Sequence, residues 1–208
     1  MTDTTTAPSQ LAAILDRLGR LLHYRQFAAG LNPAQWEALR FIDRANHYSR
    51  NPGALAEYLG TTKGTASQTL IALEEKGMIA RTRGNQDRRQ VLLELTDAGC
   101  TALAGDPVVE IARAAERIEG IDAAALTSGL SALFLELRRP SEHPTFGQCG
   151  QCVHLGSNER PADPAGPHCC RLRQGALSVD DLDRICVDYC AARQAEPGAA
   201  IAAGDPQR

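Results

Sequence analysis

Six of the seven cysteines of this 208-residue chain fall within its last 60 residues, and only Cys100 lies elsewhere. The six are Cys149, Cys152, Cys169, Cys170, Cys186 and Cys190. In a reducing cytoplasm, cysteines at this density favour metal ligation or redox chemistry over structural disulfides. The distribution therefore predicts a small cysteine module that follows a larger domain.

The spacing of these cysteines predicts a metal centre. The module opens with a C-x2-C pair, which can place two thiolates on one centre. Seventeen residues then separate Cys152 from Cys170, and fifteen separate Cys170 from Cys186. A zinc ribbon usually brings a second C-x2-C pair, which this sequence lacks, whereas single distant cysteines are common around iron–sulfur clusters. The predicted ligands are Cys149, Cys152, Cys170 and Cys186.

Three alternative ligands and three kinds of site stay open. Cys169 is an alternative to Cys170, since adjacent residues do not easily bind one site of a cluster, and His168 can replace either of them. Cys190 is the third alternative ligand, because it follows Cys186 by one helical turn. The expected cofactor is an iron–sulfur cluster of the 4Fe-4S type, with zinc or a metal-free thiol–disulfide switch as alternatives. The cysteine spacing resembles that of the small high-potential iron–sulfur proteins over about 40 residues.

Net charge and hydropathy narrow the class of protein. With 22 Lys and Arg against 25 Asp and Glu, the formal charge is -3, so any nucleic-acid contact must come from a local patch. No apolar run approaches the roughly 20 residues that a membrane span needs, and the first ten residues do not resemble a signal peptide. We expect a cytoplasmic protein with no membrane partner.

The first half of the chain predicts a helix-turn-helix. Apolar residues at helical spacing predict a helix over 10–29, and an Asn-Pro pair starts a second one over 32–48. Residues 53–77 then contain a short helix, a tight turn and a longer helix that Thr62 caps and Gly77 closes.

A basic hairpin and two helical regions follow. Strands over 78–81 and 91–95 flank the hairpin 82–89, and six Lys and Arg against three acids give residues 61–93 a local charge of +3. Helices are expected from Thr96 to about Glu119 and after Asp122 to about Arg139. Their apolar stripe favours a second copy of the chain as partner.

Four motifs in this region together resemble a known family. They are TKGTASQTL at 62–70, LEEKG at 73–77, DRR at 87–89 and LTDAG at 95–99. These segments resemble the winged helix of the multiple-antibiotic-resistance regulator (MarR) family, over roughly residues 10–140. The family's usual wing proline near Asp87 is Gln86 here. The resemblance implies a homodimer with interlocked terminal helices, a recognition helix in each major groove and a wing in the flanking minor groove.

The resemblance also implies which side chains contact the double-stranded DNA operator. They are Thr62, Lys63, Thr65, Ser67 and Gln68 on the helix and Arg83, Arg88 and Arg89 on the wing. The resemblance also allows His23, Tyr24, Phe27 and Trp36 to line a pocket for a small aromatic effector, but aromatic residues at helical spacing more often belong to a core, which is the interpretation that we favour. Cys100 is expected to be a buried small hydrophobe.

The predicted fold is mainly α with a small β-wing and a cysteine-rich metal-binding module. Residues 1–140 form the winged-helix and dimerisation domain, 141–190 the module, of which 141–148 are a linker, and 191–208 a disordered tail. The function expected is a dimeric transcriptional regulator in which the module clamps the dimerisation helices according to the state of its cluster. The alternatives are a regulator with a structural zinc site that senses an aromatic ligand, and an iron–sulfur redox protein. We expect no enzyme, because the phosphate-loop, nucleophile-elbow and HExxH motifs are missing.

Overall fold

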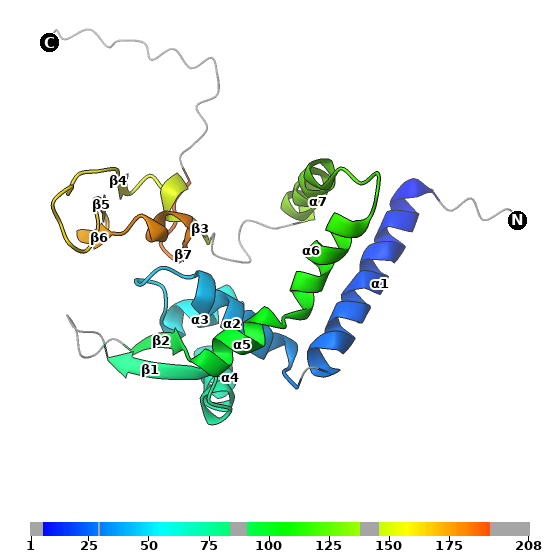
Figure 1. Cartoon of the computed structure of the whole chain (residues 1–208), viewed down its shortest axis with the longest axis horizontal. Coiled ribbons are helices and arrows are strands. Elements are labelled where there is room, and N and C mark those ends of the chain that lie inside the picture. The colour runs from blue at the N-terminus through cyan, green and yellow to red at the C-terminus, as the bar shows by residue number, and fades with distance from the viewer. Residues whose placement is uncertain (1–5, 29, 84–90, 138–145, 192–208) are drawn as a thin grey trace, which may run out of the picture.

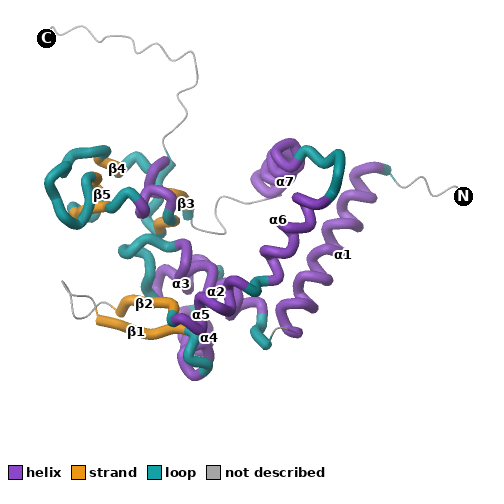
Figure 2. The backbone as a smooth tube through the Cα atoms, in the orientation of Figure 1, coloured by secondary structure: helices purple, strands orange, loops and turns teal. Residues whose placement is uncertain are grey.

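The chain folds into a helical part with one β-hairpin and a smaller part of short strands and turns (Figures 1 and 2). The computed structural model describes residues 6–28, 30–83, 91–137 and 146–191. The first part consists of α1 (Ala7–Ala28), α2 (Pro33–Arg44), α3 (Pro52–Tyr58), α4 (Lys63–Glu75), β1 (Ile79–Arg83), β2 (Val91–Leu95), α5 (Asp97–Ala104), α6 (Pro107–Arg117) and α7 (Ala123–Leu137). None of the described helices has the length and apolar character needed to cross a bilayer.

Local capping signals set where the helices of the winged helix begin. The side chain of Asn32 accepts a hydrogen bond from the backbone N–H of Gln35, whose side chain accepts one from the Asn32 N–H. Asn51 caps α3 in a similar way, and Thr62 caps α4. Such caps satisfy backbone N–H groups that have no partner within the helix. The sequence-based starts of α2 and α4 are therefore confirmed, whereas α3 begins at Pro52, one residue before the expected start at Gly53.

One core joins α2, α3 and α4 to the hairpin. Its largest fully buried side chains include Trp36, Leu39, Phe41, Ile42, Leu55, Leu70, Leu73 and Leu93. The antiparallel strands β1 and β2 pair from Ile79 opposite Leu95 to Arg83 opposite Val91. A Cβ atom at Gly99 would lie 2.1 Å from the carbonyl oxygen of Met78, so only glycine lets α5 approach the hairpin this closely. The mainly helical fold with a small β-wing is confirmed.

Helices α1, α6 and α7 extend away from this core and carry apolar side chains on their surfaces. Helix α1 lies beside α6, and an ion pair between Arg25 and Glu110 joins them (Figure 1). Helix α7 has no buried residue among those described. The exposed large apolar residues of α1, α6 and α7 include Leu11, Ile14, Leu18, Leu21, Ile111, Leu126 and Phe134.

The C-terminal part is a set of two small sheets joined by turns. Its elements are β3 (Gly147–Gln148), β4 (Leu155–Gly156), β5 (His168–Cys170), β6 (Gly175–Leu177), β7 (Ile185–Cys186) and the single 3-10 turns Cys149–Gln151 and Asp180–Asp183. Strand β3 pairs with β7, and β4, β5 and β6 form an antiparallel sheet. Residues 192–208, nearly all of the expected disordered tail, lie outside the described residues.

The cysteine module packs on the winged helix, and this corrects two expectations. Phe146, placed in the linker by the sequence analysis, packs edge-on against Phe41 and Tyr58. Ile185 belongs to the winged-helix core. The module therefore docks next to α2 and α3, rather than clamping the dimerisation helices, because its apolar residues complete the core at that point.

Candidate cysteine site and nucleic-acid interface

Helix α4 presents polar side chains on the face opposite its buried one. Ala66, Leu70 and Leu73 are buried against the core. The remaining turns expose Lys63 and Gln68, both at sequence-predicted contact positions. Polar side chains on such a surface can meet base edges and phosphates.

The other predicted contact residues of α4 differ in their exposure and in whether a hydrogen bond within the helix already occupies their hydroxyl groups. Thr62 and Thr65 are exposed, but the Thr62 hydroxyl accepts the Thr65 N–H at 3.2 Å as the helix cap. Ser67 is half-buried. The cap leaves the hydroxyl of Thr62 less free for DNA than the amide of Gln68.

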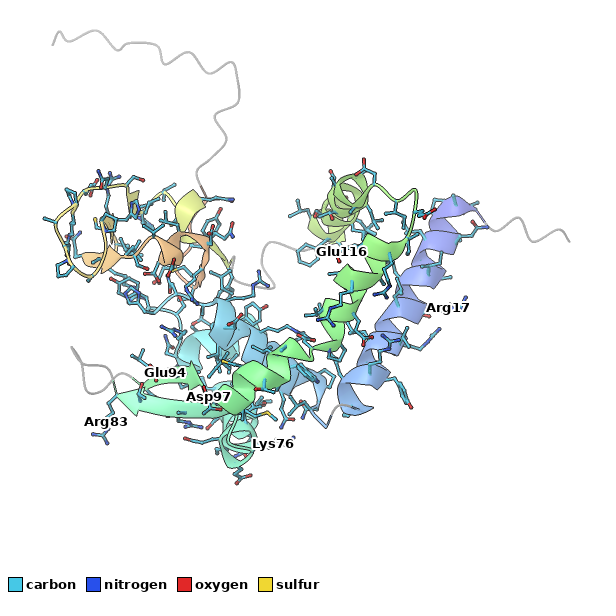
Figure 3. All side chains as sticks on the ribbon, viewed as in Figure 1. Arg17, Lys76, Arg83, Glu94, Asp97 and Glu116 are labelled. Atoms are coloured by element: carbon cyan, nitrogen blue, oxygen red, sulfur yellow. The ribbon has the colours of Figure 1, made fainter. Side chains whose placement is uncertain are left out.

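The wing supplies one described candidate contact. Arg83 is exposed and projects from the end of β1 (Figure 3). Arg81, on the same strand, instead pairs with Glu74 of α4 at 3.2 Å and so holds the hairpin against that helix. Arg88 and Arg89 lie outside the described residues.

The four cysteines named as ligands surround one small cavity in the C-terminal part. Its volume is about 10 Å³. The lining residues are Cys149, Cys152, His154, Leu155, Cys170, Leu177, Cys186 and Asp188. Cys149, Cys170 and Cys186 are buried, and Leu177 adds an apolar wall that is 2% exposed. Three loops far apart in sequence are thus folded so that their thiols face the same space.

The alternative ligands lie differently. Along β5 successive side chains point to opposite faces, so Cys170 faces the cavity while the thiol of Cys169 donates to Glu159 at 3.2 Å. This hydrogen bond raises the pKa of Cys169 and keeps its proton in place. His168 accepts the backbone N–H of Asn158 at 3.1 Å. Neither Cys169 nor His168 lines the cavity.

Cys190, the third alternative, lies at the edge of the cavity rather than in its lining. Its thiol is exposed, and its backbone N–H donates to the Cys152 sulfur at 3.5 Å. Cys190 therefore contributes to the site through its main chain. His154, which the sequence analysis did not name as a ligand, does line the cavity.

Cys149 and Cys186 interact directly and share their protons unequally. The hydrogen bond between the two thiols, followed by burial, raises the pKa of Cys149. The same bond, aided by Ser49 and Asn46, outweighs burial and lowers the pKa of Cys186 to about 6. The pair titrates as a unit, and Cys186 loses its proton more readily than Cys149. A thiolate is the form in which cysteine binds a metal.

The donor set of the cavity consists of thiols beside an apolar wall. Within 6–28, 30–83, 91–137 and 146–191, no three or more His, Cys, Asp or Glu side chains are grouped so that they could hold one metal ion. Four cysteines are a donor set that 4Fe-4S clusters and structural zinc sites share.

Residues of the winged helix complete the site, and the sequence analysis missed them. The side-chain amide of Asn46 donates to the Cys149 sulfur at 3.1 Å. The Ser49 hydroxyl accepts the Val187 N–H at 3.0 Å, and Arg184 donates to the Asp43 carbonyl oxygen at 2.6 Å. More than 130 positions separate each of these last two pairs. No local pattern marks Asn46 or Ser49, since both resemble ordinary turn residues.

The aromatic residues divide between core and surface, and one further expectation, that for Cys100, is wrong. Trp36 is buried in the core with its indole N–H donating to the Gln26 carbonyl oxygen at 3.2 Å, as the core interpretation predicts. His23, Tyr24 and Phe27 line an open groove on the surface of α1 instead. Cys100 is exposed rather than buried, because α5 turns that face away from the hairpin.

This part of the chain is a winged helix. It consists of the helix pair α3 and α4, the hairpin β1–β2 that follows, and the core that they share. Residues 29–90 match the sequence model of the MarR family, so this segment is similar to the winged helix of that family. Over 94 residues the chain is 33% identical to a protein of Thauera aromatica whose name assigns it to regulation of the hcr operon. That match covers 42% of this chain and 55% of the relative, so the chain spans about half of it.

Solved structures share the fold. A mutant of MepR from S. aureus has a TM-score of 0.54 at 18% identity and covers 64% of this chain and 99% of its own. The repressor CouR bound to a 23-mer DNA duplex has a TM-score of 0.50 at 26% identity and covers 65% of this chain and 94% of its own.

Proposed function

We propose that this protein is a homodimeric, sequence-specific DNA-binding transcriptional regulator whose DNA affinity is set by an iron–sulfur cluster. Cys149, Cys152, Cys170 and Cys186 would hold the cluster. The observation that carries the proposal is that these four side chains line one cavity directly beside the winged helix. The expected signals are oxidation, nitric oxide or iron shortage.

The surface of α4 and the wing support the DNA-binding half of the proposal. Lys63 and Gln68 are exposed on α4, the second helix of a helix-turn-helix. Arg83 lies at the end of β1 in the hairpin (Figure 3). A relative of 26% identity, CouR, has been solved on a DNA duplex. Two such helices can bind one DNA duplex at the same time when they lie about 34 Å apart, which is the length of one turn of DNA.

Dimerisation would come from the apolar faces of α1, α6 and α7. Leu18, Ile111 and Phe134 are all exposed in the single chain. A second copy that covered them would remove this apolar surface from water, which stabilises the pair. The distance between the recognition helices then depends on how the two copies pack.

The cluster would supply a charge and a redox state that small oxidants can change. Four thiols would bind it, Leu155 and Leu177 would exclude water from it, and Asn46 donates to one of the sulfurs. Loss of the cluster would remove the common anchor of the segments that carry Cys152 and Cys170. The packing of the module on α2 and α3 then weakens, and DNA affinity changes with it.

Anaerobic purification followed by a visible spectrum and analysis of iron, sulfide and zinc tests the cofactor. A coloured sample with about four irons and four sulfides per chain is the expected result. DNA affinity is then compared between this sample and the Cys149→Ser, Cys152→Ser variant, with Cys100→Ser as the control outside the cavity. We expect a change of about tenfold or more in the first variant and wild-type affinity in the second.

A second function is favoured if the sample is colourless and carries about one zinc per chain. The module would then be a structural support. The open groove on α1, lined by Arg20, His23, Tyr24 and Phe27, would be the candidate site for a small aromatic effector. Wild-type DNA affinity in the double cysteine variant would contradict sensing at the cavity in either case.

A further inference from the structure

We propose that Asn46 is a positioning residue that couples the cysteine cavity to the DNA-binding elements of the same chain, through the segment Ala45–Asn51 between α2 and α3. The inference deepens the proposed function and rests on it for its effect on DNA. It assigns the route of coupling to the winged helix itself and not to the dimerisation helices.

Asn46 is completely buried at the boundary between the two parts of the protein. One end of its side chain accepts the Ser49 N–H at 2.9 Å, and the other donates to the Cys149 sulfur at 3.1 Å. Its own backbone N–H donates to the Ile185 carbonyl oxygen at 2.9 Å. A buried amide without partners costs free energy, so Asn46 needs the cysteine module in place.

The hydrogen bond to Cys149 depends on where the loop that carries this cysteine lies. The Asn46 amide is buried and donates to the Cys149 sulfur at 3.1 Å. A displacement of that loop breaks the contact and leaves the buried amide without this acceptor, which costs free energy. The position of the cysteine loop is therefore transmitted to Asn46.

The same segment reaches the two elements that would touch DNA. The Arg50 carbonyl oxygen accepts the Leu93 N–H of β2 at 2.8 Å, which ties the segment to the wing. Asn51 caps α3 by accepting the Ala54 N–H at 3.0 Å, and α3 packs on α4. A shift at Asn46 is thus passed within five residues to both the hairpin and the helix-turn-helix.

Ser49 makes a second hydrogen bond between this segment and the cysteine module. Its hydroxyl accepts the Val187 N–H at 3.0 Å, one residue after Cys186. Asn46 therefore contacts the segment that carries Cys149, and Ser49 contacts the segment that carries Cys186. Both residues lie in the same turn of the winged helix. Such a turn can respond to the cavity as one unit.

Asn46→Asp isolates the contact with sulfur. Aspartate keeps the oxygen that accepts the Ser49 N–H but replaces the amide donor with a second oxygen. Asn51→Asp is the matched control, because it makes the same chemical change in the same segment, keeps the cap on α3 and does not touch a cysteine. Asn46→Ser is a second variant for the case that a buried aspartate prevents folding, since serine can also accept in a turn.

Hydrogen exchange gives a readout that needs neither cofactor nor DNA. We expect Asn46→Asp or Asn46→Ser to speed exchange at the amides of Val187 and Leu93 by about tenfold or more. In Asn51→Asp both amides should stay within about twofold of wild type. Unchanged exchange at Leu93 in both Asn46 variants would overturn the coupling, whatever the cavity binds.

DNA affinity then tests the functional consequence. In the wild-type protein the Cys149→Ala change should alter affinity, whereas in an Asn46→Asp background it should have little further effect, because one change removes the acceptor and the other the donor of the same contact. Independent, additive effects would overturn the inference. If Cys149→Ala has no effect on wild-type affinity, the proposed sensing fails, and the exchange data alone decide whether Asn46 couples the two parts.

Discussion

Arg40 and Asp106 form a two-point ion pair that joins the winged helix to the start of α6. The Arg40 Nε atom lies 2.5 Å from Oδ2 of Asp106, and Nη2 lies 2.9 Å from Oδ1. Asp106 is 4% exposed and also accepts the Val108 N–H as the cap of α6. One carboxylate thus orients α6 relative to α2, and with it the helices that would meet a second copy.

Replacement of Arg40 should be strongly destabilising. Arg40→Ala leaves the buried carboxylate of Asp106 without its cation, and we expect a loss of about 3 kcal/mol in the free energy of unfolding. Asp16 and Arg20 form an exposed pair on α1, so Arg20→Ala serves as the control, with a change below about 1 kcal/mol. Urea unfolding measures both. Equal losses in the two variants would contradict a special role for the Arg40 pair.

Two lysines of the α4 region should differ in their effect on DNA binding. Lys63 is exposed at the start of the helix, whereas Lys76 donates to the Gly30 carbonyl oxygen at 2.8 Å. Lys63→Ala should lower the slope of log affinity against log salt by about one. Lys76→Ala should change stability and leave the slope near wild type. Fluorescence anisotropy over a salt series would show a wrong assignment as an unchanged slope for Lys63→Ala.

Gln68 should contribute to the choice of base sequence. Its exposed amide lies on the recognition face of α4, and a glutamine amide can pair with the edge of adenine. Gln68→Ala should cost about 1–3 kcal/mol on the preferred site and less on unrelated DNA. Competition binding with a randomised duplex pool measures the ratio. Equal losses on all sequences would show that Gln68 meets only the backbone.

Asp181 should make the stability of the docked module depend on pH. Burial would raise the pKa of Asp181, but hydrogen bonds from His47 and Ser178 outweigh it and lower the pKa to about 2. Because the folded-state pKa lies below the unfolded one, this carboxylate contributes about 2 kcal/mol above roughly pH 4. The contribution is lost as pH falls toward 2. The difference in unfolding free energy between wild type and Asp181→Asn should shrink over that range, and a difference independent of pH would refute it.

Phe134 should be needed for dimer formation. It is 64% exposed on α7 in the single chain, and burial of such a ring stabilises an interface by about 2 kcal/mol, or roughly 30-fold in the dissociation constant. Phe134→Asp should shift the protein toward monomer in sedimentation experiments. Ser128→Asp, on a different face of the same helix, is the control. Dimers of equal strength in both variants would place the interface elsewhere.

The winged helix was predictable because its signals are local. The Asn32 and Thr62 caps and the two strands of the hairpin each depend on residues close together in the chain, and the structure confirms them. Apolar periodicity likewise marked the buried face of α4. The spacing of the cysteines named four residues that the structure gathers around one cavity, while their binding of a cluster stays a prediction.

Only the tertiary structure decided where the module docks and which winged-helix residues complete its cavity. Asn46 and Cys149 are 103 positions apart, and neither neighbourhood carries a pattern that specifies the other. Phe146 and Ile185 join the winged-helix core because that surface has apolar space to fill, whereas the sequence placed Phe146 in a linker. Capping and periodicity depend on neighbours along the chain, so a sequence displays them. Docking depends on the shapes and polar groups of two surfaces, which exist only after both parts have folded.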